Sequence, residues 1–157
     1  MVFTSRAGGV SSPPYESFNL GDHVGDDPED VAANRARLAR ILGLEAGQLV
    51  WMEQLHTNTV TVVDKPHTSP VEATDALVTT APGLALAVLT ADCVPVLLSD
   101  HQAGVVAAAH AGRLGARNGI VARTVEHMVR LGAVPGNIQV LMGPAAAGES
   151  YEVPAEM

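Results

Sequence analysis

Three side chains that bind metals in proteins each close an apolar stretch of this sequence. Cys93 ends the run Leu89–Cys93, His110 ends Val105–His110, and His56 ends Trp51–His56. The chain has 1 cysteine, so no disulfide can form within it, and the thiol is a packed apolar group, a nucleophile or a metal ligand. If the three segments are neighbouring strands, one sulfur and two nitrogens meet at one rim. That is the donor set of an open zinc site.

The residues around Cys93 favour a site over a buried thiol. Asp92 carries a charge that an apolar interior does not accept without a partner. Pro95 follows closely and indicates a bend or the start of a new strand. On this evidence Asp92 is a candidate to orient a ligand or to move a proton.

A glycine-bearing turn follows His110 and offers a second candidate feature. Gly112 and Gly115 permit close approach of the backbone, while Arg113 and Arg117 add positive charge. Backbone N–H groups and the start of a helix at Arg117 would bind a phosphate or a carboxylate. In the N-terminal loop, Arg6 is either an anion clamp or an ordinary exposed cation.

The remaining pattern supplies the elements that position these residues. Residues 4–25 are rich in Gly, Ser and Pro and predict an ordered loop. Asp27 as N-cap, Pro28 at the first turn and Gly43 as a stop predict a helix between them. A second helix is expected over 117–130. Strands, several of them apolar enough to be buried on both faces, are expected at Gln48–Glu53, Thr59–Val63, Ala76–Thr79, Leu84–Leu89, Val94–Leu98, Val105–Ala109 and Ile138–Met142.

Composition limits the class of protein. With 157 residues, 47% hydrophobic but only 3% aromatic, the chain predicts one domain whose core is built from Ala, Val and Leu. A formal net charge of -8 argues against nucleic acid or an anionic membrane as the main partner. No apolar run reaches the roughly 20 residues of a membrane span. With a single cysteine and no signal-peptide pattern, we expect a cytoplasmic location.

Five parts of the sequence together carry a family resemblance: Thr4–Ser11, Phe18–Asp26, Gln54–His56, Leu89–Val96 and Ala109–Gly112. Taken in this order, they resemble the YfiH-like family, also labelled the multicopper polyphenol oxidase or laccase-domain family. The resemblance runs from Phe3 to Val153, almost the whole chain. This chain has Arg113-Leu114 where the family usually has Trp-Arg. The family continues well past Val153, so residues 1–157 are expected to be a single laccase-domain unit lacking its C-terminal part.

The resemblance implies a mixed α/β (α+β) fold with a mixed sheet flanked by helices, related to the deamidating toxin domains of the cytotoxic-necrotizing-factor type. It implies a zinc site from His56, Cys93 and His110, with Arg6 and Asn19 at motif positions near it. The implied activity is that of a purine nucleoside phosphorylase with adenosine deaminase and methylthioadenosine phosphorylase activity. Its partners would be purine nucleosides and inorganic phosphate, held by Arg6 or Arg113, in a monomer or a small homo-oligomer.

Three other functions stay open. A copper polyphenol oxidase needs several metals and therefore clustered ligands, but most of the 6 histidines lie singly in polar or helical segments. A metal-free hydrolase would use Cys93 and His110 as a dyad. A truncated homologue would keep the fold without activity.

Overall fold

A mixed five-stranded sheet lies at the centre of the molecule, in the order β2-β3-β6-β5-β7. β2 and β3 are parallel, and the other pairings of this sheet are antiparallel. The computed structural model describes residues 1–45 and 47–152, so Val153, the expected end of the resemblance, lies outside the described residues. The strands are β2 (Val60–Val62), β3 (Ala76–Thr79), β5 (Val94–Asp100), β6 (Val105–Ala111) and β7 (Gln139–Met142).

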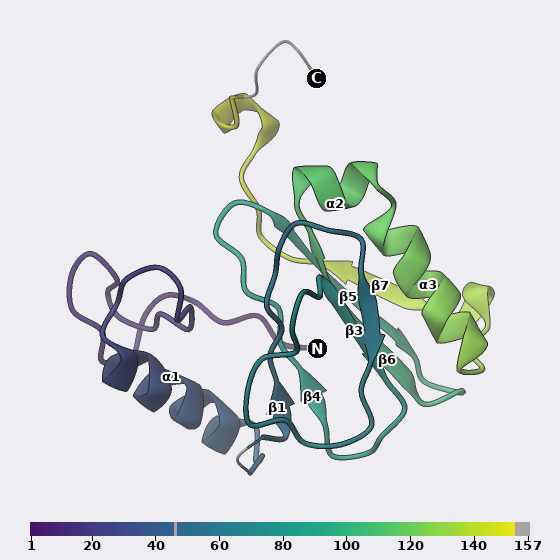
Figure 1. The fold of residues 1–157 in the computed structure, drawn as a ribbon, viewed down its shortest axis with the longest axis horizontal. Coiled ribbons are helices and arrows are strands. Elements are labelled where there is room, and N and C mark those ends of the chain that lie inside the picture. The colour runs from purple at the N-terminus through teal and green to yellow at the C-terminus, as the bar shows by residue number, and fades with distance from the viewer. Residues whose placement is uncertain (46, 153–157) are drawn as a thin grey trace.

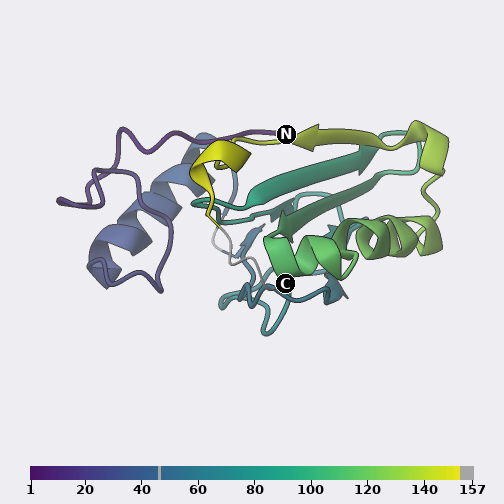
Figure 2. The ribbon, with the colours of Figure 1, turned by 90° about the horizontal axis from the view of Figure 1, so that it is seen from above.

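Two further layers cover the sheet on opposite faces. On one face lie α2 (Arg113–Arg117) and α3 (Ile120–Arg130), as Figure 2 shows. The other face carries β1 (Leu49–Val50) and β4 (Ala85–Leu86), a parallel pair. Side chains of β6 alternate between the two resulting cores, because successive residues of a strand point to opposite faces. Ala107 and Ala109 pack in the core beneath α3, and Ala108 packs in the other. The expected mixed sheet flanked by helices is confirmed.

Helix α1 (Pro28–Ile41) stands beside the β1–β4 pair, next to the N-terminal loop (Figure 1). It begins as expected, since the Asp27 side chain accepts a hydrogen bond from the Glu29 backbone N–H. Its buried face includes a polar residue that periodicity did not reveal. Asn34 is fully buried and bonds to Val10, Ser11, Ser17 and Asn19 of the loop. The helix therefore holds the loop through one amide as well as through apolar packing.

The helix expected over 117–130 is confirmed as α3, but its expected start was wrong. The short helix α2 ends before it, because Gly119 between the two helices has φ 81, in the left-handed region that breaks an α-helix. The expected strands at 48–53 and 84–89 contract to two residues each. Two short 3-10 helices complete the secondary structure, η1 (Pro135–Asn137) and η2 (Gly148–Ser150).

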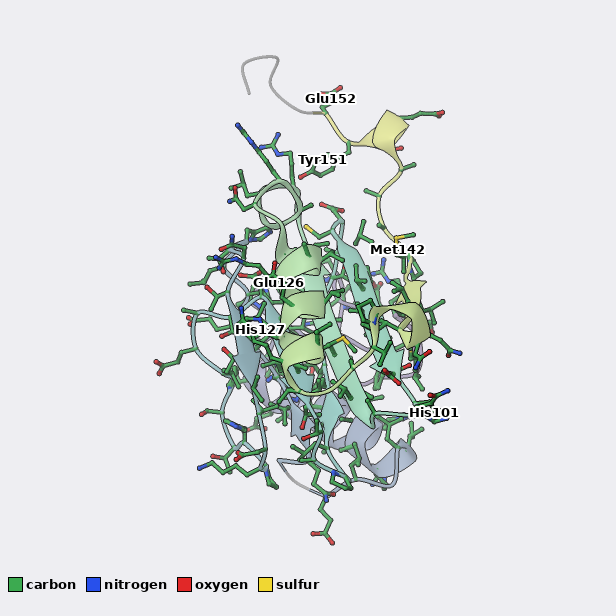
Figure 3. The ribbon with its side chains drawn as sticks, turned by 90° about the vertical axis from the view of Figure 1, so that its right-hand side faces the viewer. His101, Glu126, His127, Met142, Tyr151 and Glu152 are labelled. Carbon is green, nitrogen blue, oxygen red and sulfur yellow. The ribbon has the colours of Figure 1, made fainter. Side chains whose placement is uncertain are left out.

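Strand β7 lies at the edge of the sheet and is exposed, although its sequence is as apolar as that of the buried strands. Val140 is 54% and Met142 70% exposed, since within the described part of the chain β7 pairs only with β5, while α3 contacts β6, β3 and β2. Figure 3 shows Met142 at one end of the sheet and His101 at the other. Among the described residues, no helix has both the length and the apolar character needed to span a bilayer.

Candidate metal centre

The topology brings Cys93 and His110 to the same end of the sheet. Cys93 directly precedes β5, and His110 lies near the end of the antiparallel β6, where it is opposite Pro95. Cys93 therefore lies just before the start of a strand, whereas the sequence predicted it at the end of one. His56 comes from the turn between β1 and β2. The expectation that the three side chains meet at one rim is confirmed.

The three side chains are close enough to share one ion. Each offers one ligand atom, and these atoms lie within 4.8 Å of one another. Cys93 Sγ is 3.8 Å from His56 Nε2, and the two imidazoles are edge to face with centroids 4.7 Å apart. A tetrahedral zinc with ordinary bond lengths separates sulfur and nitrogen by about 3.5 Å. The donor set and its spacing therefore fit zinc with small adjustments of the side chains.

Gly112 keeps the space between the three ligands open. A Cβ at this position would lie 2.7 Å from His56 Cδ2, 3.1 Å from Cys93 Sγ and 3.4 Å from His110 Cε1. The glycine is thus required by close approach, as the sequence suggested, and its φ of -69 is one that any residue adopts. Gly115 also meets the expectation, because a Cβ there would lie 2.8 Å from Thr57 O.

Asp75 is the site residue that the sequence reading missed. It is 0% exposed, and its carboxylate accepts hydrogen bonds from His110 Nδ1 at 2.9 Å and from the turn that carries His56. Burial raises the pKa of Asp75, but the bonds from His110, Thr57 and Leu55 outweigh it and hold that pKa below its ordinary value. The carboxylate is therefore ionised at neutral pH. Its position just before the buried run Ala76–Thr79 was the available signal, because a charge there needs a partner.

The environment of Cys93 disfavours a free thiolate. Burial, together with the nearby Asp92 and Asp75 carboxylates, raises the pKa of the Cys93 thiol, against a hydrogen bond from the Arg113 backbone N–H. The thiol is thus predominantly protonated at neutral pH unless a cation lies beside it. A metal-free nucleophile would need the opposite shift.

A large open cavity of about 1280 Å³ adjoins the three ligands. Its lining includes His56, Cys93 and His110, together with Asp92, Arg6 and Asn19. Asp92 is exposed on this wall, and its backbone carbonyl accepts a bond from Ala146 N–H. The Arg113 side chain is exposed but is not among the described residues that line the cavity. Its backbone N–H is the part that faces the site.

Arg6 and Asn19 build the N-terminal loop that forms one side of the cavity. The Arg6 guanidinium donates to Glu16 O at 3.0 Å and to Pro14 O at 3.3 Å. The Asn19 side chain bonds to Gly21 and to a carboxylate oxygen of Asp26. Both residues therefore line the cavity while they hold its wall in shape.

The other histidines stand apart from the three ligands. His23 lines the same cavity but is not part of the ligand group, and His101 follows β5 at the end opposite Cys93. Figure 3 shows His127 on α3. Among residues 1–45 and 47–152, His56, Cys93 and His110 form the one group of three or more potential ligands.

Two solved bacterial structures show the same fold. The Bacillus licheniformis hypothetical protein YfiH matches with a TM-score of 0.88 and 37% identity over 92% of this chain and 57% of its own. YlmD from Geobacillus stearothermophilus matches with a TM-score of 0.84 and 37% identity over 90% of this chain and 56% of its own.

Curated relatives carry the name purine nucleoside phosphorylase. One from Corynebacterium glutamicum is 67% identical over 99% of this chain and 64% of its own length. One from Mycobacterium bovis is 58% identical over 99% of this chain and 62% of its own length. This chain thus spans less than two thirds of these relatives. The family described as multi-copper polyphenol oxidoreductase laccase matches residues 1–157, so the chain belongs to that laccase-domain, YfiH-like family.

Proposed function

We propose that this chain carries the metal centre of a zinc-dependent purine nucleoside phosphorylase that also deaminates adenosine and cleaves methylthioadenosine. The observation that carries the proposal is the convergence of His56, Cys93 and His110 beside an open cavity. The name shared by relatives of 58% and 67% identity supports the reaction class. The proposal treats residues 1–157 as one laccase-domain unit.

Zinc is a metal that this donor set suits. Two imidazoles and a thiolate would hold it and leave it one further position for water or substrate. When bound, zinc supplies Lewis acidity, which polarises an oxygen or lowers the pKa of water at that position. The raised thiol pKa is consistent with a cysteine that is ionised only beside a cation.

The residues of the cavity wall would act on the substrate. In phosphorolysis a phosphate oxygen attacks C1′ of the ribose, the bond from C1′ to N9 breaks, and the purine leaves with a proton. Asp92, exposed beside Cys93, would hold or deliver that proton. Arg6 is better placed than Arg113 to bind the phosphate, since Arg6 lines the cavity. Asn19 would keep the loop that carries Arg6 in position.

Deamination uses the same cavity with water as the nucleophile. Water adds at C6 of adenosine, the bond from C6 to the amino nitrogen breaks, and ammonia leaves after it gains a proton. A carboxylate on the wall, such as Asp92, would carry this proton. The two reactions would therefore compete for one cavity, and the ratio of free base to ammonia reports which of them dominates.

Elemental analysis combined with product analysis tests the proposal. The purified protein should contain about one zinc per chain and release free base from adenosine or inosine only with phosphate, and ammonia from adenosine without it. Cys93→Ala should abolish zinc retention and turnover together. His101→Ala is the matched control, because His101 lies at the opposite end of β5, and it should retain both.

Each competing function predicts a different result. Several coppers and a blue colour would indicate a polyphenol oxidase. Activity that survives strong chelation but is lost on thiol alkylation would indicate a Cys93–His110 dyad. Zinc binding without base or ammonia release would indicate an inactive homologue. Turnover retained by Cys93→Ala would refute the assignment of the site.

A further inference from the structure

We propose that Asp75 is a positioning residue that fixes both imidazoles of the site at once, an inference that rests on the proposed metal centre. Its Oδ1 accepts bonds from His110 Nδ1 at 2.9 Å and from the His56 backbone N–H at 3.0 Å. Its Oδ2 accepts bonds from Leu55 N–H at 3.2 Å and from Thr57 N–H and Oγ1–H, both at 2.8 Å. One buried carboxylate thus joins a strand histidine to a loop histidine.

The bond to His110 selects the tautomer of that ring. A carboxylate only accepts hydrogen bonds, so the Nδ1 that faces it carries the proton. Nε2 is then left with its lone pair and is the atom free to bind a metal. The backbone reinforces this placement, because His110 N–H donates to Asp75 O at 2.8 Å. His110 is therefore bonded to Asp75 both through its backbone N–H and through its ring.

The bonds to residues 55–57 hold His56 in an unusual backbone conformation. His56 has φ 60, in the left-handed region that non-glycine residues rarely adopt and that the surrounding structure must stabilise. Three consecutive N–H groups of this turn converge on the Asp75 carboxylate. The His56 ring is exposed and packs edge to face against His110, and the turn directs its Nε2 towards Cys93.

Asn in place of Asp75 cannot satisfy both sets of donors. An amide has one accepting oxygen and one donating NH₂ group, whereas all five partners of Asp75 are donors. If NH₂ faces His110 Nδ1, that ring must move its proton to Nε2 and loses its free lone pair. If NH₂ faces Thr57, the N–H groups of Leu55 and Thr57 lose their acceptor, and the His56 N–H is the one backbone bond that still ties the turn to this side chain. Either orientation removes one ligand from its position.

Asp100 provides a matched control within the same chain. It is also buried, and its carboxylate accepts backbone N–H groups from Gln102, Ala103 and Val134. It lies at the far end of β5 from Cys93, about 20 Å away along the strand. Asp100→Asn therefore damages a comparable buried cap without touching either imidazole.

Two measurements test the proposal, one with zinc and one without metal. Competition with a chromophoric chelator gives the zinc affinity, which should fall roughly 10- to 100-fold in Asp75→Asn and stay unchanged in Asp100→Asn. Two-bond ¹H–¹⁵N spectra of the metal-free wild type in alkaline buffer should show His110 as the Nδ1–H tautomer. The second measurement needs neither a folded variant nor turnover, so it stands even if the proposed reaction fails.

The proposal is overturned by any of three results. The first is an Nε2–H tautomer for His110 in the metal-free wild type. The second is a folded Asp75→Asn protein that binds zinc as tightly as the wild type. The third is an equal loss of affinity in Asp100→Asn, which would mean that general destabilisation, and not positioning, lowers it. Absence of phosphorolysis with these measurements as expected would count against the proposed reaction alone.

Discussion

Replacing Gly112 with alanine should close the metal centre without unfolding the protein. The added Cβ would lie 2.7 Å from His56 Cδ2, whereas carbon atoms in contact are about 3.5–4.0 Å apart, so the ring must move by about 1 Å. Metal–ligand bond lengths in proteins stay within about 0.2 Å of their ordinary values, so a ring displaced this far must rotate back or lose the ion. The contact of 3.1 Å to Cys93 Sγ blocks the space from a second side.

The fold itself should tolerate this substitution. Gly112 has φ -69 and ψ 164, which alanine adopts without strain, and replacing glycine in such a conformation stabilises proteins by about 0.4–1 kcal/mol. His56 is exposed and can swing outward. We therefore expect the metal-free variant to unfold within a few degrees of the wild type, with zinc affinity at least about 100-fold lower, beyond the upper range for loss of an outer hydrogen-bond partner.

Chelator competition and thermal unfolding of the metal-free protein together decide the outcome. Gly136→Ala is the matched control, since a Cβ there meets nothing within 4 Å and Gly136 lies outside the site. It should change neither quantity. A Gly112→Ala protein that binds zinc with wild-type affinity would refute the reasoning, because the ion could not then occupy the space between the three ligands.

Two further predictions concern buried polar side chains, one beside the N-terminal loop and one at the end of β5 opposite Cys93. Asn34→Ala should destabilise the protein by about 2–3 kcal/mol and expose the N-terminal loop to protease, because it leaves the buried Ser11 hydroxyl and the partly buried Val10 N–H and Asn19 carbonyl without their partner. Asn137→Ala, which removes one exposed bond, should stay within about 0.5 kcal/mol in chemical denaturation, and equal losses would contradict the role of Asn34. Backbone N–H groups of Val134 and Ala103 lower the pKa of Asp100 below 3.8, so its stabilising contribution is complete above that pH and is lost as pH falls through the lower, folded-state pKa. The difference in unfolding free energy between wild type and Asp100→Asn should shrink below pH 3.8, and a pH-independent difference would contradict this.

The position of the site could be predicted because it depends on backbone periodicity. Apolar runs at β3, β5 and β6 predict buried strands, and residues at the ends of neighbouring strands meet at one edge. Even the wrong assignment of Cys93 to the end of a strand left it at the correct rim. The start of a strand and the end of its antiparallel neighbour lie together.

The parts that could not be predicted depend on buried polar groups. Asp75 and Asn34 occur in apolar surroundings, and their partners are 15 to 35 residues away along the chain. Periodicity identifies which face is buried but not which distant donors reach it. The charge criterion applied to Asp92 holds equally for Asp75, and the structure exposes the first and buries the second. Of two charged residues that each adjoin a strand, the one whose strand is covered on both faces is thus the better candidate to be buried and to hold the site residues in place.

The number of metal-binding groups bears on the description of the family as a multi-copper oxidoreductase. Two imidazoles and one thiolate also form the equatorial set of a mononuclear copper site, so the donors of this site do not by themselves choose between the metals. A multicopper enzyme needs several such groups, and the described residues assemble one, around His56, Cys93 and His110. Oxidation of a substrate by several coppers would therefore require further metal ligands outside that group. A single open site beside a cavity suits Lewis-acid chemistry on a nucleoside, because that chemistry needs one ion and no electron relay.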